Sequence, residues 1–134
     1  MAKPHLLERL RLALATLILL SACAQKAPAP AGGLMDVAER PAEKALLAGI
    51  RAYDDAQYAE SEKQFRQALG AGLASARDRA AAHKHLAFMA CTSNRVSECE
   101  AEFRWARQAD PAFVLTKSEA GHPLWGPVYK RVLP

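Results

Sequence analysis

The side chains that could do chemistry here are three cysteines, Cys23, Cys91 and Cys99, and four histidines. His83 and His85 are two residues apart, so on a helix they point to different faces, whereas a zinc-binding pair is usually four apart. Neither Cys91 nor Cys99 belongs to a Cys-x-x-Cys motif, which disfavours a redox enzyme. No phosphate loop or nucleophile motif is present. Unless the fold assembles a site from distant residues, we expect no enzyme, no metal and no small-molecule substrate or cofactor.

The beginning of the chain has the organisation of an export signal. The basic residues Lys3, Arg9 and Arg11 precede an apolar run over residues 12–20, which is too short to span a bilayer. The run ends at Leu20-Ser21-Ala22-Cys23, which resembles the bacterial lipobox. The resemblance implies a signal peptide over residues 1–22 and covalent lipid on Cys23, whose several acyl chains would anchor the protein stably. An ordinary signal peptide with an incidental cysteine, or an uncleaved anchor, are the alternatives.

The residues after Cys23 predict a tether. By resemblance to lipoproteins of enteric bacteria, Ala24 in place of an aspartate favours the outer membrane, with the domain facing the periplasm. Residues 23–38 contain two prolines and the pair Gly32-Gly33, without apolar periodicity. We therefore expect the lipidated cysteine to be followed by a flexible linker.

The positive charge of the chain belongs largely to the targeting segment. Removing residues 1–22 deletes three of 18 basic and one of 14 acidic residues, so the net charge falls from +4 to +2. No basic stripe with interleaved aromatic residues follows, so we expect no nucleic-acid binding. About a hundred residues remain, which suffice for one small domain.

Residues 83–111 are predicted to form a helical hairpin. Apolar residues recur at helical spacing on both sides of a polar turn, and Asp110-Pro111 ends the second helix. The pattern also occurs upstream, with Phe65 38 residues before Phe103. It resembles the tetratricopeptide (TPR) repeat, whose usual period is about 34 residues. We expect an all-α domain with two TPR-like hairpins over residues 39–111; an unrelated four-helix array is the alternative.

Helix ends can be predicted from capping residues. Asp54 and Asp55 are expected to cap the second helix and Gly70 to end it. Ser75 followed by Asp78 resembles a capping box for the third helix. On the fourth helix Glu98, Glu100 and Glu102 are interpreted as its solvated side.

Residues 112–134 are too apolar for a disordered tail. A pair of hairpins leaves an open hydrophobic end, so this segment is predicted to cap it, with Pro127 starting a short last helix. Trp125 and Tyr129 then pack in the core. The alternative is a recognition loop that presents His122 and Trp125 to a partner.

Together the lipobox, the Pro/Ala linker, the degenerate TPR pair and the ending Ala120-Gly121-His122-Pro123-Leu124-Trp125-Gly126-Pro127-Val128-Tyr129 resemble the TssQ-type lipoproteins associated with bacterial type VI secretion systems. The resemblance implies an accessory component of a contractile secretion machine at the cell envelope, with no established enzymatic step. It does not identify the partner.

In TPR proteins the first helices of successive repeats line a concave groove. Carried onto this chain, that register predicts a partner groove formed by Leu46, Ile50, Tyr53, Lys84 and Phe88. An apolar helix or an extended peptide could bind there, with Lys84 pairing an acidic group. The alternative is that the chain's own tail fills the groove.

Cys91 and Cys99 would lie in an oxidising periplasm, where paired thiols tend to form disulfides. TPR register places Ala87, rather than Cys91, against Cys99, and a disulfide needs Cα atoms within about 7 Å. A disulfide is favoured; two buried free thiols are the alternative.

The predicted function is a membrane-anchored periplasmic adaptor that binds protein partners in a cell-envelope complex, as an accessory assembly lipoprotein of type VI secretion. The alternatives are a TPR lipoprotein that guides assembly of another outer-membrane machine, such as a pilus secretin or the barrel-insertion apparatus, and a peptidoglycan-binding envelope protein.

Overall fold

The computed structural model describes residues 33, 36 and 39–133. These residues form helices and connections without a strand, which confirms the predicted all-α class. The helices are α3 (Pro41–Asp54), α4 (Tyr58–Ala71), α5 (Ala76–Thr92), α6 (Val96–Ala109), α7 (Lys117–Ala120) and α8 (Gly126–Val132). The predicted signal peptide, Cys23 and the linker apart from Gly33 and Asp36 lie outside the described residues.

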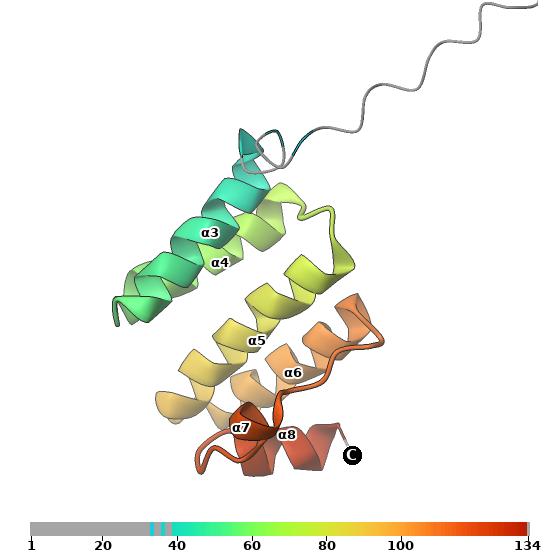
Figure 1. Cartoon of the computed structure of the whole chain (residues 1–134). Helices are drawn as coiled ribbons and strands as arrows, with labels where there is room; N and C mark the ends of the chain where they lie inside the picture. Colours follow the sequence, from blue (N-terminus) through green and yellow to red (C-terminus); the bar gives the residue numbers. More distant parts are fainter. Residues whose placement is uncertain (1–32, 34–35, 37–38, 134) are drawn as a thin grey trace, which may run out of the picture. The chain divides into compact units, whose positions relative to one another are not determined.

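The helices pair as two consecutive hairpins (Figure 1). Helix α3 packs along α4, and α5 packs along α6, while α4 and α5 join the hairpins. In the first hairpin, apolar residues of α3 such as Leu46 cluster with Phe65 and Ala68 of α4, and Leu86 of α5 completes this core. The spacing of these residues places them on one face of each helix, so burying that face selects the hairpin.

Residues 38 positions apart occupy similar places in the two hairpins. Phe65 and Phe103 are both fully buried. So are Ser61 and Cys99. In the first hairpin the Ser61 hydroxyl donates a hydrogen bond to the Gly49 carbonyl at 2.9 Å. Helices α3 and α4 approach closely there, since a Cβ at Gly49 would lie 3.0 Å from the Phe65 ring.

The helix ends agree only partly with the predicted caps. Ser75 caps α5 as predicted, because its hydroxyl accepts a hydrogen bond from the Asp78 amide at 3.2 Å. The caps predicted at Asp54 and Asp55 are wrong: the N-cap of α4 is Gln57, which makes no side-chain cap bond. The predicted end at Gly70 is also wrong, because α4 continues to Ala71 and the left-handed C-cap is Gly72, at φ 86°.

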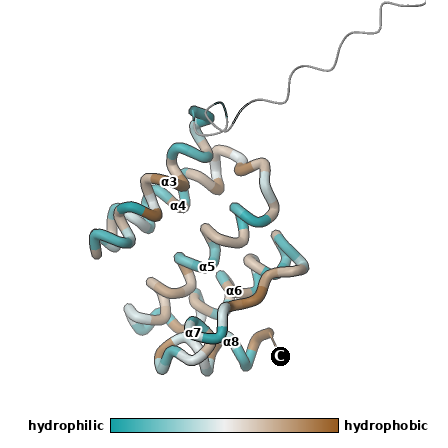
Figure 2. Tube along the Cα trace, viewed as in Figure 1, coloured by the Kyte–Doolittle hydropathy of each residue, from teal (hydrophilic) through white to brown (hydrophobic). Residues whose placement is uncertain are grey.

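The segment after α6 folds back over the second hairpin. Figure 2 shows the hydrophobic stretch between α6 and α7, in which Phe113 and Leu115 are buried while Val114 is 68% exposed. Helix α8 packs against α6, and its Tyr129 meets Phe103 edge to face at 5.4 Å between ring centroids. The Tyr129 hydroxyl also accepts a hydrogen bond from the Leu115 amide at 3.3 Å. The end of the second hairpin is therefore covered by the chain itself.

Candidate partner-binding cleft

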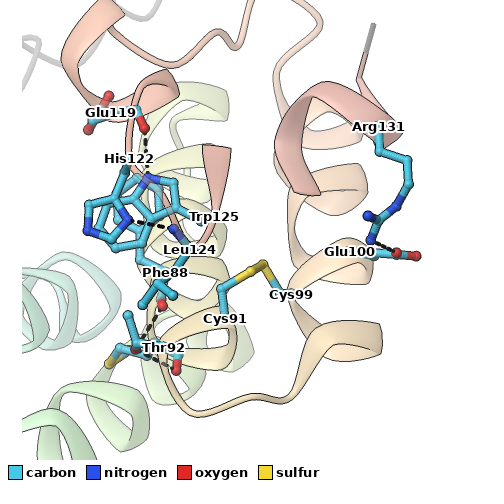
Figure 3. The surroundings of a disulfide bond; sticks show 11 residues. Phe88, Cys91, Thr92, Cys99, Glu100, Glu119, His122, Leu124, Trp125 and Arg131 are labelled. Atoms are coloured by element: carbon cyan, nitrogen blue, oxygen red, sulfur yellow. Dashed lines mark hydrogen bonds and ion pairs between the residues drawn. A yellow bond between two sulfur atoms is a disulfide. The ribbon is translucent and has the colours of Figure 1, made fainter. Parts of the chain in front are cut away.

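Three aromatic rings stack on the side of α5, as Figure 3 shows. The Trp125 indole lies on Phe88, with ring centroids 4.2 Å apart, and the His122 imidazole lies on the indole at 3.3 Å. The indole N–H donates a hydrogen bond to the Glu119 carbonyl at 2.8 Å. The Leu124 amide donates to Nδ1 of His122 at 3.2 Å. Trp125 therefore belongs to the packing of the C-terminal segment, and His122 covers its outer face.

An ion pair lies beside the stack. Lys84 of α5 contacts the Glu119 carboxylate at 2.6 Å. Glu119 also belongs to a capping box at α7, in which its carboxylate accepts hydrogen bonds from the amide and hydroxyl of Thr116 at 2.9 Å each. Burial by itself would raise the pKa of Glu119, but the bonds from Lys84 and Thr116 outweigh burial and lower it. Glu119 is thus a stable anion that ties α7 to α5.

These contacts correct the predicted partner groove. Phe88 is covered by Trp125 and is only 4% exposed, and Lys84 pairs with the chain's own Glu119. Leu46 is buried in the core of the first hairpin, and Ile50 packs against that core. Tyr53 packs edge to face on His85, at 5.0 Å. The five residues therefore do not form one open groove, and the C-terminal segment occupies the part that α5 provides.

An open cleft remains next to the ion pair. Its volume is about 500 Å³, and it lies between α5 and the connection that follows α6. The α5 wall consists of Arg77, Ala80, Ala81 and Lys84, and the opposite wall of Asp110, Ala112, Phe113, Val114, Thr116 and Glu119. The cleft thus carries charges of both signs, and several of its other lining residues are small.

Val114 and Arg77 are two groups in this cleft that can bind something else. Val114 is 68% exposed, and its backbone makes no hydrogen bond within the part of the chain that the structure describes. Arg77 is exposed and forms no ion pair with another described residue. A peptide with an acidic side chain can satisfy both, through backbone hydrogen bonds to Val114 and a charged contact with Arg77.

The two remaining cysteines form a disulfide. The bond joins Cys91 near the end of α5 to Cys99 in α6, with the Cα atoms 5.2 Å apart (Figure 3). Both residues are buried. The disulfide therefore joins the two helices of the hairpin on which the C-terminal segment packs.

Sequence reasoning missed a buried carboxylate. Glu102, interpreted as solvated, is 1% exposed, and it contacts Nδ1 of His83 at 2.7 Å. Its other oxygen lies 3.9 Å from the Arg66 guanidinium. In the sequence, the spacing of Glu102 matches the exposed side of α6. In the folded domain, however, helices α4 and α5 cover this residue. A T-x-x-E pattern at Thr116 and Glu119 is a second signal in the sequence, and it predicts the start of α7.

The described part of the chain holds no group of three or more His, Cys, Asp or Glu residues arranged for a metal ion. Among the described residues, no helix is long and apolar enough to cross a bilayer. The fold and the cleft define an all-α domain of two helical hairpins with a C-terminal cover. Comparison with protein-family models, with curated proteins and with solved structures finds no match.

Proposed function

We propose that this chain is a lipid-anchored periplasmic adaptor, attached to the outer membrane through Cys23, that binds a protein partner of a cell-envelope complex. The resemblance of its lipobox, linker and C-terminal sequence to the TssQ-type lipoproteins favours an accessory role in assembly of a type VI secretion system. On this proposal the chain carries out no chemical step and acts by holding its partner near the membrane.

We further propose that the two hairpins are TPR-like repeats. The similar burial of Phe65 and Phe103, and of Ser61 and Cys99, supports this interpretation. The turns support it too, because Ala56 and Asn94, again 38 residues apart in the sequence, both adopt positive φ values, 57° and 59°. Repeats of this kind typically serve as binding scaffolds, since stacking leaves one face of the array available.

The observation that carries the proposed function is Val114, which is 68% exposed, lines the same cleft as Arg77 and makes no backbone hydrogen bond with another described residue. An exposed valine at the edge of a cleft gives a partner apolar contact, and a free amide and carbonyl give it direction. We therefore place the partner between α5 and residues 110–116.

The test is affinity purification of the tagged full-length protein from detergent-solubilised envelopes after mild crosslinking, with mass spectrometry of the recovered proteins. Val114→Asp is the cleft variant, because Val114 is exposed and the substitution leaves the core intact. Leu124→Asp is its matched control, since Leu124 is 53% exposed and lies outside the cleft. Cys23→Ser removes the proposed lipid.

We expect type VI membrane-complex or baseplate subunits with the unaltered protein and with Leu124→Asp, and a loss of at least tenfold with Val114→Asp. If these subunits are also lost with Cys23→Ser, the lipid anchor is required for their recovery. Recovery of pilus-secretin or barrel-insertion subunits instead would contradict the type VI assignment. Equal recovery with both aspartate variants would contradict the proposal that the partner binds in the cleft.

A further inference from the structure

A second pocket lies away from the cleft, in the crevice between α5 and α6. It has a volume of about 490 Å³ and is lined by Arg79, His83, Trp105, Gln108 and Ala109. Trp105 is 47% exposed, although tryptophan is the largest apolar side chain of the domain. None of these residues contributes to the stack on α5 or to the proposed partner site.

The pocket has a rigid base. The buried Glu102 carboxylate contacts Nδ1 of His83 at 2.7 Å, so that nitrogen carries a proton and Nε2 is the other ring nitrogen. The imidazole then lies 5.7 Å from the Trp105 ring, between centroids, and tilted by 50°. Glu102 thus fixes the orientation of the histidine, and the indole lies beside it.

The rim of the pocket supplies hydrogen-bonding groups. The Nη1 atom of Arg79 donates to the carbonyls of Leu73 and Ala74, at 2.9 Å each, which holds the guanidinium in place. Its Nη2 and Nε atoms, and the side-chain amide of Gln108, make no hydrogen bond within the described residues. Both side chains therefore have donors left for a ligand, and the amide also has an acceptor.

This combination suits one chemical class. A pyranose ring has an apolar face of C–H groups, which packs on an aromatic ring, and an edge of hydroxyl groups, which needs donors and acceptors beside that ring. We propose that the pocket binds a sugar ring of a glycan, with the ring on the Trp105 indole and its hydroxyl groups at Arg79, Gln108 and Nε2 of His83.

A protein partner fits this surface less well. The neighbours of Trp105 on α6 are Ala101, Arg104, Gln108 and Ala109. No second large apolar side chain therefore lies next to the indole along the helix. A stable protein interface buries about 800 Å² on each partner, far more than one indole provides. A small ligand with one apolar face matches the area that is exposed.

The first experiment uses the full chain purified in detergent, with the tryptophan indole N–H signals observed by NMR during titration with the chitin trisaccharide. We expect a saturable shift of the Trp105 signal, with the Trp125 signal unchanged because its N–H is bonded to Glu119. In titrations followed by calorimetry, which need no indole signal, Trp105→Ala should weaken binding at least tenfold relative to the unaltered protein, and Trp105→Phe should restore part of it. Leu124→Ala, which removes another exposed apolar side chain, should bind as the unaltered protein does.

A parallel experiment measures co-sedimentation of the same proteins with purified cell-wall sacculi, which distinguishes a wall glycan from a free oligosaccharide as the source of the sugar. Retention that Trp105→Ala abolishes indicates the wall; trisaccharide binding without retention indicates a free sugar. Gln108→Ala gives a second variant should Trp105→Ala fail to fold. The proposal is overturned by no shift at millimolar sugar together with no retention, or by binding that neither variant changes. Partner recovery through the cleft does not depend on either result.

Discussion

The Trp125 indole packs on the Phe88 ring with the two planes 21° apart, so a residue of the C-terminal segment covers the face of α5 that a partner would otherwise contact. The two tryptophans of the chain thus differ in their surroundings. Trp125 is stacked between Phe88 and His122, whereas Trp105 is 47% exposed.

Trp125→Ala should lower the free energy of unfolding by about 2–4 kcal/mol, because it removes a partly buried aromatic ring, its stacking and its hydrogen bond to the Glu119 carbonyl. Trp105→Ala should change it by less than about 0.5 kcal/mol, since it alters an exposed helix position. Urea unfolding followed by circular dichroism measures both. Similar losses in the two variants would contradict the stacked position of Trp125.

Reduction of the Cys91–Cys99 disulfide should destabilise the domain by about 2.5 kcal/mol, the value that chain entropy gives for so short a loop. Urea midpoints with and without a strong thiol reductant measure the change. The double variant Cys91→Ala/Cys99→Ala serves as the control, because its midpoint should not respond to the reductant. A response in that variant would assign the effect to something other than this bond.

Stability should fall when the pH drops below about 6.5, through His85. This histidine lies between the hairpins, stacked on Phe65 at 4.9 Å, and its Nδ1 donates to the Ala81 carbonyl at 2.7 Å. Burial lowers its pKa below the usual 6.5, an effect that the Ala81 bond only partly offsets. As the pH falls, His85 therefore takes up a proton in the unfolded chain before it does so in the folded chain. Lowering the pH below about 6.5 thus favours unfolding.

Urea midpoints between pH 7.5 and 5 measure this dependence. The matched variant His85→Phe keeps a ring in the same place but cannot be protonated, so its midpoint should vary less over that range. The charged groups that act on His85 are Lys84, Glu119 and Asp54, and all three remain in the variant. An unchanged slope in His85→Phe would assign the pH dependence to another group.

Gly126→Ala should destabilise the C-terminal cover by about 1–3 kcal/mol, because a Cβ there would lie 2.5 Å from the Ala120 carbonyl oxygen. That contact is with backbone, so it cannot be relieved by rotating a side chain. Gly70→Ala is the control: apart from its chain neighbours and the backbone of its own helix, no described atom lies within 4 Å of a Cβ there, and alanine should stabilise α4 by about 0.5–1 kcal/mol. Thermal unfolding of both variants tests the pair, and opposite shifts in Tm are expected.

The helices and their approximate bounds could be predicted from the sequence, because the signals are local. Apolar spacing indicates which residues share a face, and Ser75 and Pro111 act on neighbouring backbone groups. The caps at Asp54 and Asp55 were wrong for an equally local reason. The chain turns through Ala56 in a left-handed conformation, which an alanine seldom adopts and the sequence does not signal.

The candidate sites could be predicted only in part. For Trp125 the sequence favoured packing in the core over a recognition loop with His122, and the structure agrees. For Lys84 and Phe88 it predicted a groove that either a partner or the chain's own tail could fill. It also took Glu102 for a solvated residue. What lies opposite a side chain depends on residues far away in the sequence: 19 positions for His83 against Glu102, and 37 for Trp125 over Phe88.

By itself, the sequence determined that the described residues form helices, and which of their faces are apolar, since periodicity is a property of neighbouring residues. Only the tertiary structure decided that Trp125 packs inward while Trp105 faces outward, that Cys91 reaches Cys99, and that Arg77 and Val114 share a cleft. Burial and proximity arise from the way separate helices pack, and a helix of given apolarity can be covered by a partner or by its own chain. Here the C-terminal segment covers α5 next to Phe88 and leaves the cleft beside it open.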